Sequence, residues 1–304
     1  MDIFLPIAHV DVSIWLILAF GGIIGLLSSA LGVGGGFLLT PLLIFSGVPP
    51  IVAAATSATQ IVGTSAAGSY SHLRMGNVDV KIAVPGLLGS WFGAATGVWV
   101  ARILERSGHF GTMVSFVYIV VLTTVAVSMF WESVNALRRS RGGGQGASAP
   151  AAPGFASRLP WQMDFPISGV RHSVLLPFGL GAVIGLLPAI GMGGGFVLVP
   201  VMIYVLKMPT KVAMGTSLFQ LVFTTLVVSI LQAGLNHAVD PYLALLLILG
   251  SIFGVQIGTR LSAMLPAEQL RLLLAVVLIG VSIKLLFGLL IMPHFPISMV
   301  AGVQ

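Results

Sequence analysis

The sequence predicts an all-α polytopic membrane protein built as two inverted repeats, each with a glycine-broken first helix pair followed by three transmembrane helices. Its 304 residues are 57% hydrophobic and only 7% charged, and their mean hydropathy is +1.08. Soluble domains carry about 25% charged residues, so this composition excludes a water-soluble enzyme. Two further observations support the prediction. Several apolar runs are long enough to span a bilayer, and one ordered set of motifs occurs twice.

Eight apolar stretches are long enough to cross a bilayer, which takes about 20 mostly apolar residues in a helix. They cover residues 12–31, 51–71, 82–101, 111–131, 173–190, 212–233, 241–260 and 269–291. Two shorter pieces, residues 37–45 and 196–206, each follow a triple glycine and are expected to be half-helices or re-entrant segments. The first stretch is expected to be a retained helix, because Asp2 and Asp11 stand where a signal peptide carries basic residues.

One sizeable hydrophilic region divides these stretches into two groups. Residues 132–172 hold a run of glycines, a Pro/Ala/Ser-rich stretch and five arginines, which are Arg138, Arg139, Arg141, Arg158 and Arg171. This composition is typical of a flexible linker, so we expect a first repeat at 1–131 and a second at 173–304. With the linker in the cytoplasm, eleven basic residues face inward and only Arg102 and Arg106 face outward. This positive-inside bias predicts that both termini are periplasmic.

The two groups share an ordered set of motifs. GVGGGF at residues 32–37 matches GMGGGF at 191–196, and small residues recur every fourth position at 89–97 and again at 250–258. The predicted topology inverts one unit relative to the other. Inverted repeats with interrupted helices are typical of secondary transporters, which bind substrate near the midplane at the repeat interface. The small residues favour close-packed helix faces, within one chain or between the chains of a homodimer.

The glycine breaks supply the first candidate binding groups. Uncovered N–H groups at the start of a half-helix bind anions, because the helix dipole is positive there. Two facing breaks would make a pocket for a small oxyanion. The candidate residues are Gly34, Gly35, Gly36, Gly193, Gly194 and Gly195. The alternative is that these glycines only permit a kink or a tight helix crossing.

Polar side chains on the helices that follow supply the second group. They are repeated at the same spacing: Thr56, Ser57 and Gln60, then Thr216, Ser217 and Gln220. Hydroxyl and amide groups suit an oxyanion without the cost of a buried charge, but they also form hydrogen bonds between membrane helices. Lys284, the one charge inside a predicted span, either attracts the anion or extends to the interface.

Several chemistries lack the residues they need. The chain has no cysteine, its six histidines show no metal-binding spacing, and Walker A, HExxH and GxSxG motifs are absent. We therefore expect no cofactor, metal or catalytic residue, and the bases between apolar runs indicate a lipid bilayer rather than nucleic acid. The predicted spans contain no Asp or Glu, so coupling to a cation is hard to build. Export of an anion gains about 2.3 kcal/mol per 100 mV from a negative interior.

The GxGGGF runs, the T-S-x-x-Q helices and the duplicated order resemble the TauE/SafE sulfite exporter family. The resemblance covers nearly the whole chain except the linker and the termini. It implies a carrier in the bacterial inner membrane that exports sulfite or an organosulfonate such as sulfoacetate. It also implies that a binding role falls on the duplicated glycines, threonines, serines and glutamines.

The leading hypothesis is therefore an exporter of a small sulfur-containing oxyanion, with sulfite first. One alternative is a cation-coupled importer of sulfate or a sulfonate. Another is a membrane scaffold that acts through its arginine-rich linker and does not transport. An intramembrane enzyme is disfavoured because the spans lack a Ser–His or Asp–Asp pair.

Overall fold

The computed structural model describes residues 2–8, 10–141 and 161–291 and is mostly helical. The first half contains α1 (Ile14–Leu31), α2 (Gly36–Phe45), α3 (Pro50–Arg74), α4 (Val80–Arg106) and α5 (Phe110–Arg141). The second half contains α6 (Leu175–Ile184), the 3-10 turn η2 (Leu187–Ile190), α7 (Gly195–Tyr204), α8 (Thr210–Leu231), the π-turn η3 (Gln232–Asn236), α9 (Pro241–Met264) and α10 (Ala267–Ile291). The all-α prediction is confirmed. The stretch predicted at 173–190 is not one long helix, because it begins in a strand and divides into α6 and η2.

Two short hairpins were not predicted. In the first, β1 (Asp2–Leu5) pairs antiparallel with β2 (Val10–Ser13). In the second, β3 (Gln162–Phe165) pairs antiparallel with β4 (Val170–Ser173). The second hairpin and the end of α5 both lie in the stretch expected to be linker, and residues 142–160 lie outside the described residues. Both halves therefore run in the order hairpin, broken helix pair, three long helices.

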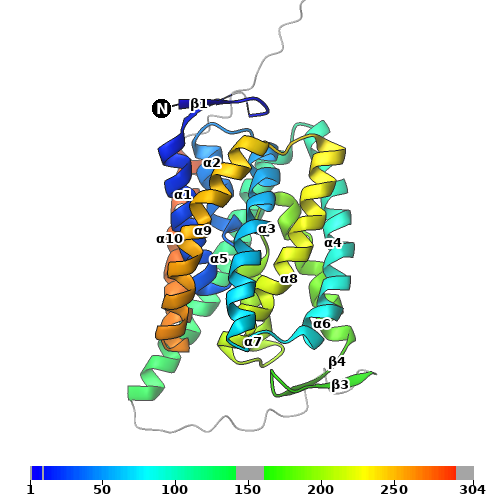
Figure 1. The fold of residues 1–304 in the computed structure, drawn as a ribbon, viewed down its shortest axis with the longest axis vertical. Coiled ribbons are helices and arrows are strands. Elements are labelled where there is room, and N and C mark those ends of the chain that lie inside the picture. Colours follow the sequence, from blue (N-terminus) through cyan, green and yellow to red (C-terminus); the bar gives the residue numbers. More distant parts are fainter. Residues whose placement is uncertain (1, 9, 142–160, 292–304) are drawn as a thin grey trace, which may run out of the picture.

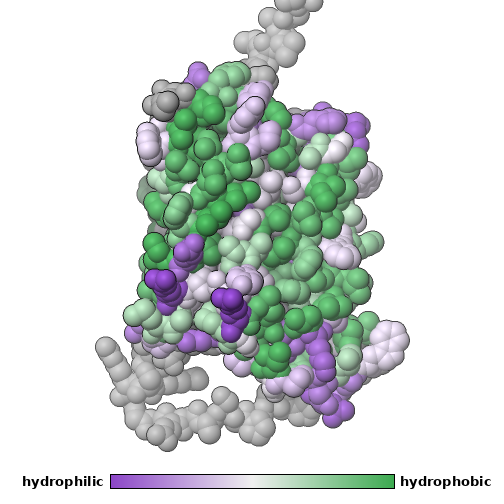
Figure 2. All heavy atoms as spheres, in the orientation of Figure 1, coloured by the Kyte–Doolittle hydropathy of each residue, from purple (hydrophilic) through white to green (hydrophobic). Residues whose placement is uncertain are grey.

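The outer surface suits a lipid environment. Five helical segments in the described part of the chain are long and apolar enough to cross a membrane: α1, Phe110–Ser128 of α5, α4, α8 with η3, and α9. Large apolar side chains are exposed on them, including Phe92, Trp99 and Phe253. Figure 2 shows hydrophobic residues across the middle of one face and hydrophilic ones mostly toward its ends. In lipid, unlike in water, this exposure costs nothing.

The α3 helix, which is not one of these five, also carries buried polar residues. Thr56, Ser57, Gln60 and Ser65 are all fully buried on it. The helix packs against α8 and α9 and lies at the centre of the bundle in Figure 1. Its polar side chains therefore face protein rather than lipid, which is where intramembrane polar residues are tolerated.

Small residues join the two halves at two equivalent contacts, where α1 packs on α9 and α6 packs on α4. A methyl group added to a glycine of α9 or α4 would meet backbone oxygens of the facing helix. The glycines in these contacts are Gly250, Gly254 and Gly258 on α9 and Gly89 and Gly93 on α4. The predicted close-packed faces are thus confirmed, and they are used within one chain.

Each hairpin also holds the start of a helix from the other half. Asp79 caps α4 and accepts hydrogen bonds from the backbone N–H (3.0 Å) and hydroxyl (2.6 Å) of Ser168 in the second hairpin. Asp240 caps α9 and accepts one from the backbone N–H of Ile7 in the first hairpin at 3.1 Å. In Figure 1 the two hairpins lie at opposite ends of the molecule. Both carboxylates are buried, so each closes one end of the bundle.

Candidate functional site

The two glycine breaks meet inside the bundle. A Cβ atom built on Gly36, the first residue of α2, would lie 2.7 Å from the carbonyl oxygen of Gly191 and 3.0 Å from the nitrogen of Gly193. The rings of Phe37 and Phe196, which follow the breaks, pack with centroids 5.7 Å apart. The expectation that the breaks face each other therefore holds at the level of backbone contact.

Glycine is required at the breaks by backbone conformation. Each run has three residues with positive φ, between 73° and 82°: Gly32, Gly34, Gly35, Gly191, Gly193 and Gly194. Residues other than glycine adopt this left-handed backbone conformation only at a cost in free energy. Gly36 and Gly195 have ordinary φ, and they are glycines because the opposite break leaves no room for a Cβ atom.

The breaks expose backbone donors that have no acceptor. Within the described residues, no hydrogen bond is made by the N–H groups of Gly34, Gly35, Gly193 or Gly194. They lie at the N-termini of α2 and α7, where the helix dipoles add positive potential. The first N–H groups of a helix have no partner within it, and free N–H groups of this kind can accept an anion.

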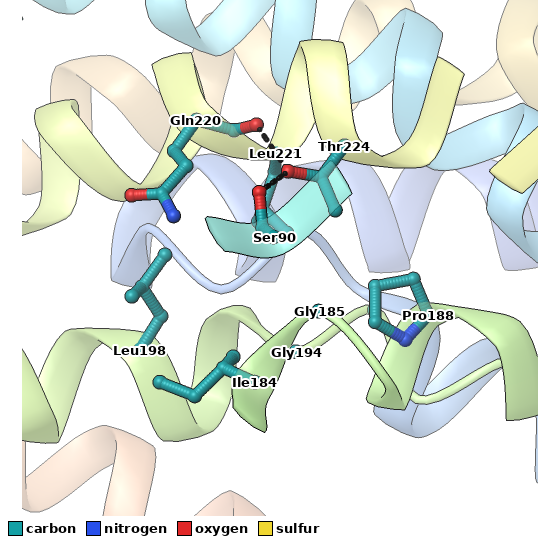
Figure 3. Close-up of a pocket in the computed structure, with 10 residues that line it drawn as sticks. Ser90, Ile184, Gly185, Pro188, Gly194, Leu198, Gln220, Leu221 and Thr224 are labelled. Carbon is teal, nitrogen blue, oxygen red and sulfur yellow. Dashed lines mark hydrogen bonds between the residues drawn. The ribbon is translucent and has the colours of Figure 1, made fainter. Parts of the chain in front are cut away.

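A small pocket of about 10 Å³, which is room for about one water molecule, opens beside the second break (Figure 3). Its polar lining comes from Gln220 and Thr224 on α8, Ser90 on α4, and the break itself. In Figure 3 these three side chains face Ile184, Gly194 and Leu198. The full lining is uncharged: Ser90, Ile184, Gly185, Pro188, Gly193, Gly194, Leu198, Gln220, Leu221 and Thr224.

Gln220 has the side chain best placed to bind a ligand in this pocket. It is 3% exposed, and its amide atoms lie 2.9 Å from the position that a Cβ atom of Gly86 would take. The absence of a side chain at Gly86 therefore makes room for the amide. Beside it, the Ser90 and Thr224 hydroxyls are hydrogen-bonded to each other at 2.7 Å, and the Thr224 hydroxyl donates to the backbone carbonyl of Gln220.

The chain matches known membrane transporters over most of its length. The family model described as sulfite exporter TauE/SafE matches residues 17–285. The chain belongs to the TauE/SafE family. A probable membrane transporter of Xylella fastidiosa strain 9a5c is 30% identical over 88% of this chain and 92% of its own. The probable membrane transporter YjnA of Bacillus subtilis is 28% identical over 89% of this chain and 98% of its own. The probable membrane transporter YunE of the same organism is 23% identical over 90% of this chain and 97% of its own.

These relatives are named as transporters, so this TauE/SafE chain is a multi-pass membrane transporter and not an enzyme. No solved structure shows a significant match to it.

Three of the predicted hydroxyls hold the TauE/SafE bundle together. The Thr56 hydroxyl accepts the backbone N–H of Asp240 at 3.1 Å, and the Thr216 hydroxyl accepts that of Asp79 at 2.9 Å. The Ser217 hydroxyl donates to the carbonyl of Gly32 in the opposite break. For these three residues, the contacts favour hydrogen bonding between helices over substrate binding.

The other predicted residues have different surroundings. Gln60 is fully buried, and neither its amide nitrogen nor its amide oxygen has a partner among the described residues. The Ser57 hydroxyl is likewise buried and unpaired there. Gln60 and Gln220 therefore differ, since only Gln220 lines the pocket. Lys284 belongs to α10, and its side chain lies outside the described residues.

Sequence reasoning missed Ser90 and Thr224. The signal was present, because Thr64 and Thr224 follow Gln60 and Gln220 at the same four-residue spacing, on the same helix face. Ser90 stood inside a run of glycines that indicated only helix packing. Its contact with Thr224 joins positions 134 residues apart, and one sequence cannot show such a pair.

Proposed function

We propose that this transporter exports a small, singly charged sulfur oxyanion, with bisulfite first and an organosulfonate second. The substrate binds near the midplane, at the pocket beside the second glycine break, which widens to admit it. The observation that carries the proposal is the set of unpaired N–H groups at two meeting helix N-termini. Gln220, which lines the pocket, adds amide donors to the backbone N–H groups.

The chemistry of the pocket lining supports the choice of charge. An oxyanion accepts hydrogen bonds from N–H donors, and this pocket offers the Gln220 amide and the backbone N–H groups of the break without a cation. The cost of transferring an ion from water grows with the square of its charge, and neutral donors offset only part of it. One negative charge is therefore favoured over two. Bisulfite and the sulfonates meet this condition, whereas sulfate and the sulfite dianion do not.

Charge distribution supports export from the cytoplasm. No acidic residue lines the pocket, so a carboxylate to carry a coupling proton or sodium ion is missing from that lining. A negative cell interior drives an anion outward without a coupling ion.

We place the transporter in the bacterial inner membrane, with the arginine-rich linker in the cytoplasm and both termini in the periplasm. Hairpins at opposite ends of the molecule support inverted halves.

Binding measured on the purified protein tests the site. Calorimetric titration with bisulfite at mildly acidic pH should show saturable binding, and methanesulfonate should compete while sulfate and chloride compete weakly. Replacing Gln220 with alanine should weaken binding at least about tenfold, the loss expected when a buried ion loses a donor. The matched control is Gln256→Ala on the exposed face of α9, which should bind as the unaltered protein does.

The result has a clear contrary outcome. If Gln220→Ala and Gln256→Ala bind bisulfite equally well and both are folded, the pocket is not the binding site. Binding that requires sodium ions, or flux in liposomes that requires a proton or sodium gradient, would favour the cation-coupled importer instead.

A further inference from the structure

The first glycine break carries polar groups that the proposed site does not use. The hydroxyls of Ser28 on α1 and Ser65 on α3 are fully buried, and neither has a hydrogen-bond partner among the described residues. The Ser65 oxygen lies 3.7 Å from the position that a Cβ atom of Gly34 would take, and the Ser28 Cβ lies 3.4 Å from that of Gly35. Both serines therefore lie beside the first break, Ser65 next to Gly34 and Ser28 next to Gly35.

Unpaired buried hydroxyls cost stability, because each has lost its hydrogen bonds to water and gained none in return. A cluster of them beside two unpaired N–H groups is hard to explain by packing. All four groups can donate a hydrogen bond. Donors of this kind around the N-terminus of α2 match the oxygens of one small anion.

The equivalent places at the second break are built differently. Gly35 lies against Ile24 and Ser28, whereas Gly194 lies against Ile184 and Pro188, so a proline replaces the first serine. Ser65 corresponds to Thr225, whose hydroxyl already donates to the carbonyl of Leu221 at 2.8 Å. The two breaks therefore do not duplicate one site, and the free hydroxyls belong to the first break alone.

Two apolar side chains lie where the two breaks meet. The terminal carbon of Ile61 lies 2.9 Å from the Cβ position of Gly193, and that of Leu221 lies 2.7 Å from the Cβ position of Gly34. Ile61 also lies 2.6 Å from the Cβ position of Gly36, and Leu221 lies 2.7 Å from that of Gly195. Both side chains therefore pack against both breaks and fill the space where the breaks meet.

We propose that the first break is a second oxyanion subsite, formed by the hydroxyls of Ser28 and Ser65 and the N–H groups of Gly34 and Gly35. The same singly charged anion occupies it after leaving the pocket at the second break, once the side chains of Ile61 and Leu221 turn aside. This inference rests on the proposed function, because it assigns a second binding site to the same substrate.

The double variant Ser28→Ala/Ser65→Ala tests the subsite. It should bind bisulfite in the pocket within about twofold of the unaltered protein, but its bisulfite flux in liposomes should fall at least about tenfold. Its unfolding temperature should be unchanged or higher, because it removes hydroxyls that have no partner. A merely structural role would give the opposite sign of the stability change.

Ser29→Ala is the matched control. Ser29 neighbours Ser28, and its hydroxyl is hydrogen-bonded to that of Thr259 at 2.5 Å. This variant should unfold at a lower temperature and keep its flux per folded molecule. The crossed pattern, with stability lost in one variant and transport lost in the other, supports the subsite.

Three outcomes overturn the subsite. They are full flux in the double variant, lost flux accompanied by lost stability, and loss of pocket binding together with flux, which would indicate one merged site. Each leaves the proposed function standing if the unaltered protein binds and moves bisulfite. Absence of binding and flux in the unaltered protein would remove the proposed function and the subsite together.

Discussion

At the scale of single residues, glycine serves two different purposes in the breaks. Gly34 and Gly35 supply a left-handed backbone that turns the chain between two helices. Gly36 has ordinary φ and supplies space, since the opposite break lies against it. Both purposes keep the backbone N–H groups uncovered, which is what anion binding requires.

Replacing Gly34 with alanine should combine both penalties. The new Cβ atom would lie 2.7 Å from Leu221 on a residue whose φ is 78°, and strain with overpacking costs about 2–4 kcal/mol. Gly76→Ala is the control, since its φ is 70° but nothing lies within 4 Å. It should cost only about 1 kcal/mol. Thermal unfolding in detergent measures both, and equal losses would show that space at the break does not matter.

At the scale of elements, the hairpins stabilise helix starts from the opposite half. Asp79 accepts hydrogen bonds from both the backbone and the hydroxyl of Ser168 and from the backbone N–H of Ile82 at 3.4 Å. Its own backbone N–H donates to Thr216. The second hairpin, α4 and α8 therefore meet at one buried carboxylate.

Asp79→Ala should destabilise the protein by about 2 kcal/mol, because it removes a helix cap and leaves buried donors unpaired. Asp11→Ala, on the exposed side of β2, should change stability by no more than about 0.5 kcal/mol. The unfolding temperatures of the two variants are to be compared at one pH. Equal stability in both would contradict the account of the hairpin as a clamp.

Periodicity and length predicted the elements well, but not their partners. The long apolar stretches and the glycine breaks appear as helices and breaks at the expected places, because bilayer thickness and backbone sterics fix them locally. The four-residue strands carried no such signal. The roles of Thr56 and Thr216 depend on partners 184 and 137 residues away. Only the folded chain brings those partners together.

At the scale of the whole molecule, the halves are intertwined. The contacts of α1 with α9, of α6 with α4 and of α3 with α8 all cross between them. The units predicted at 1–131 and 173–304 therefore share one interior. The glycine breaks are buried in this interior and touch each other there.

An uncharged site predicts a characteristic pH dependence of transport. Bisulfite loses its proton near neutral pH and becomes a dianion, which the uncharged donors bind poorly. Bisulfite flux at constant total sulfite should therefore fall as pH rises through neutrality. Methanesulfonate keeps a single negative charge over this pH range, so its flux should stay constant. Comparing the two fluxes therefore distinguishes titration of the substrate from titration of the protein. Parallel decline of both fluxes would assign the effect to the protein instead.

The most direct test of the transport account is sulfite flux from liposomes with the membrane potential clamped and no proton or sodium gradient. For one negative charge, 100 mV is worth about 2.3 kcal/mol, which corresponds to an equilibrium concentration ratio of about 50-fold. An interior-negative potential should drive saturable sulfite efflux toward that ratio, and reversal of the potential should reverse the flux. Flux that ignores the potential, or appears only with an imposed cation gradient, would contradict the account.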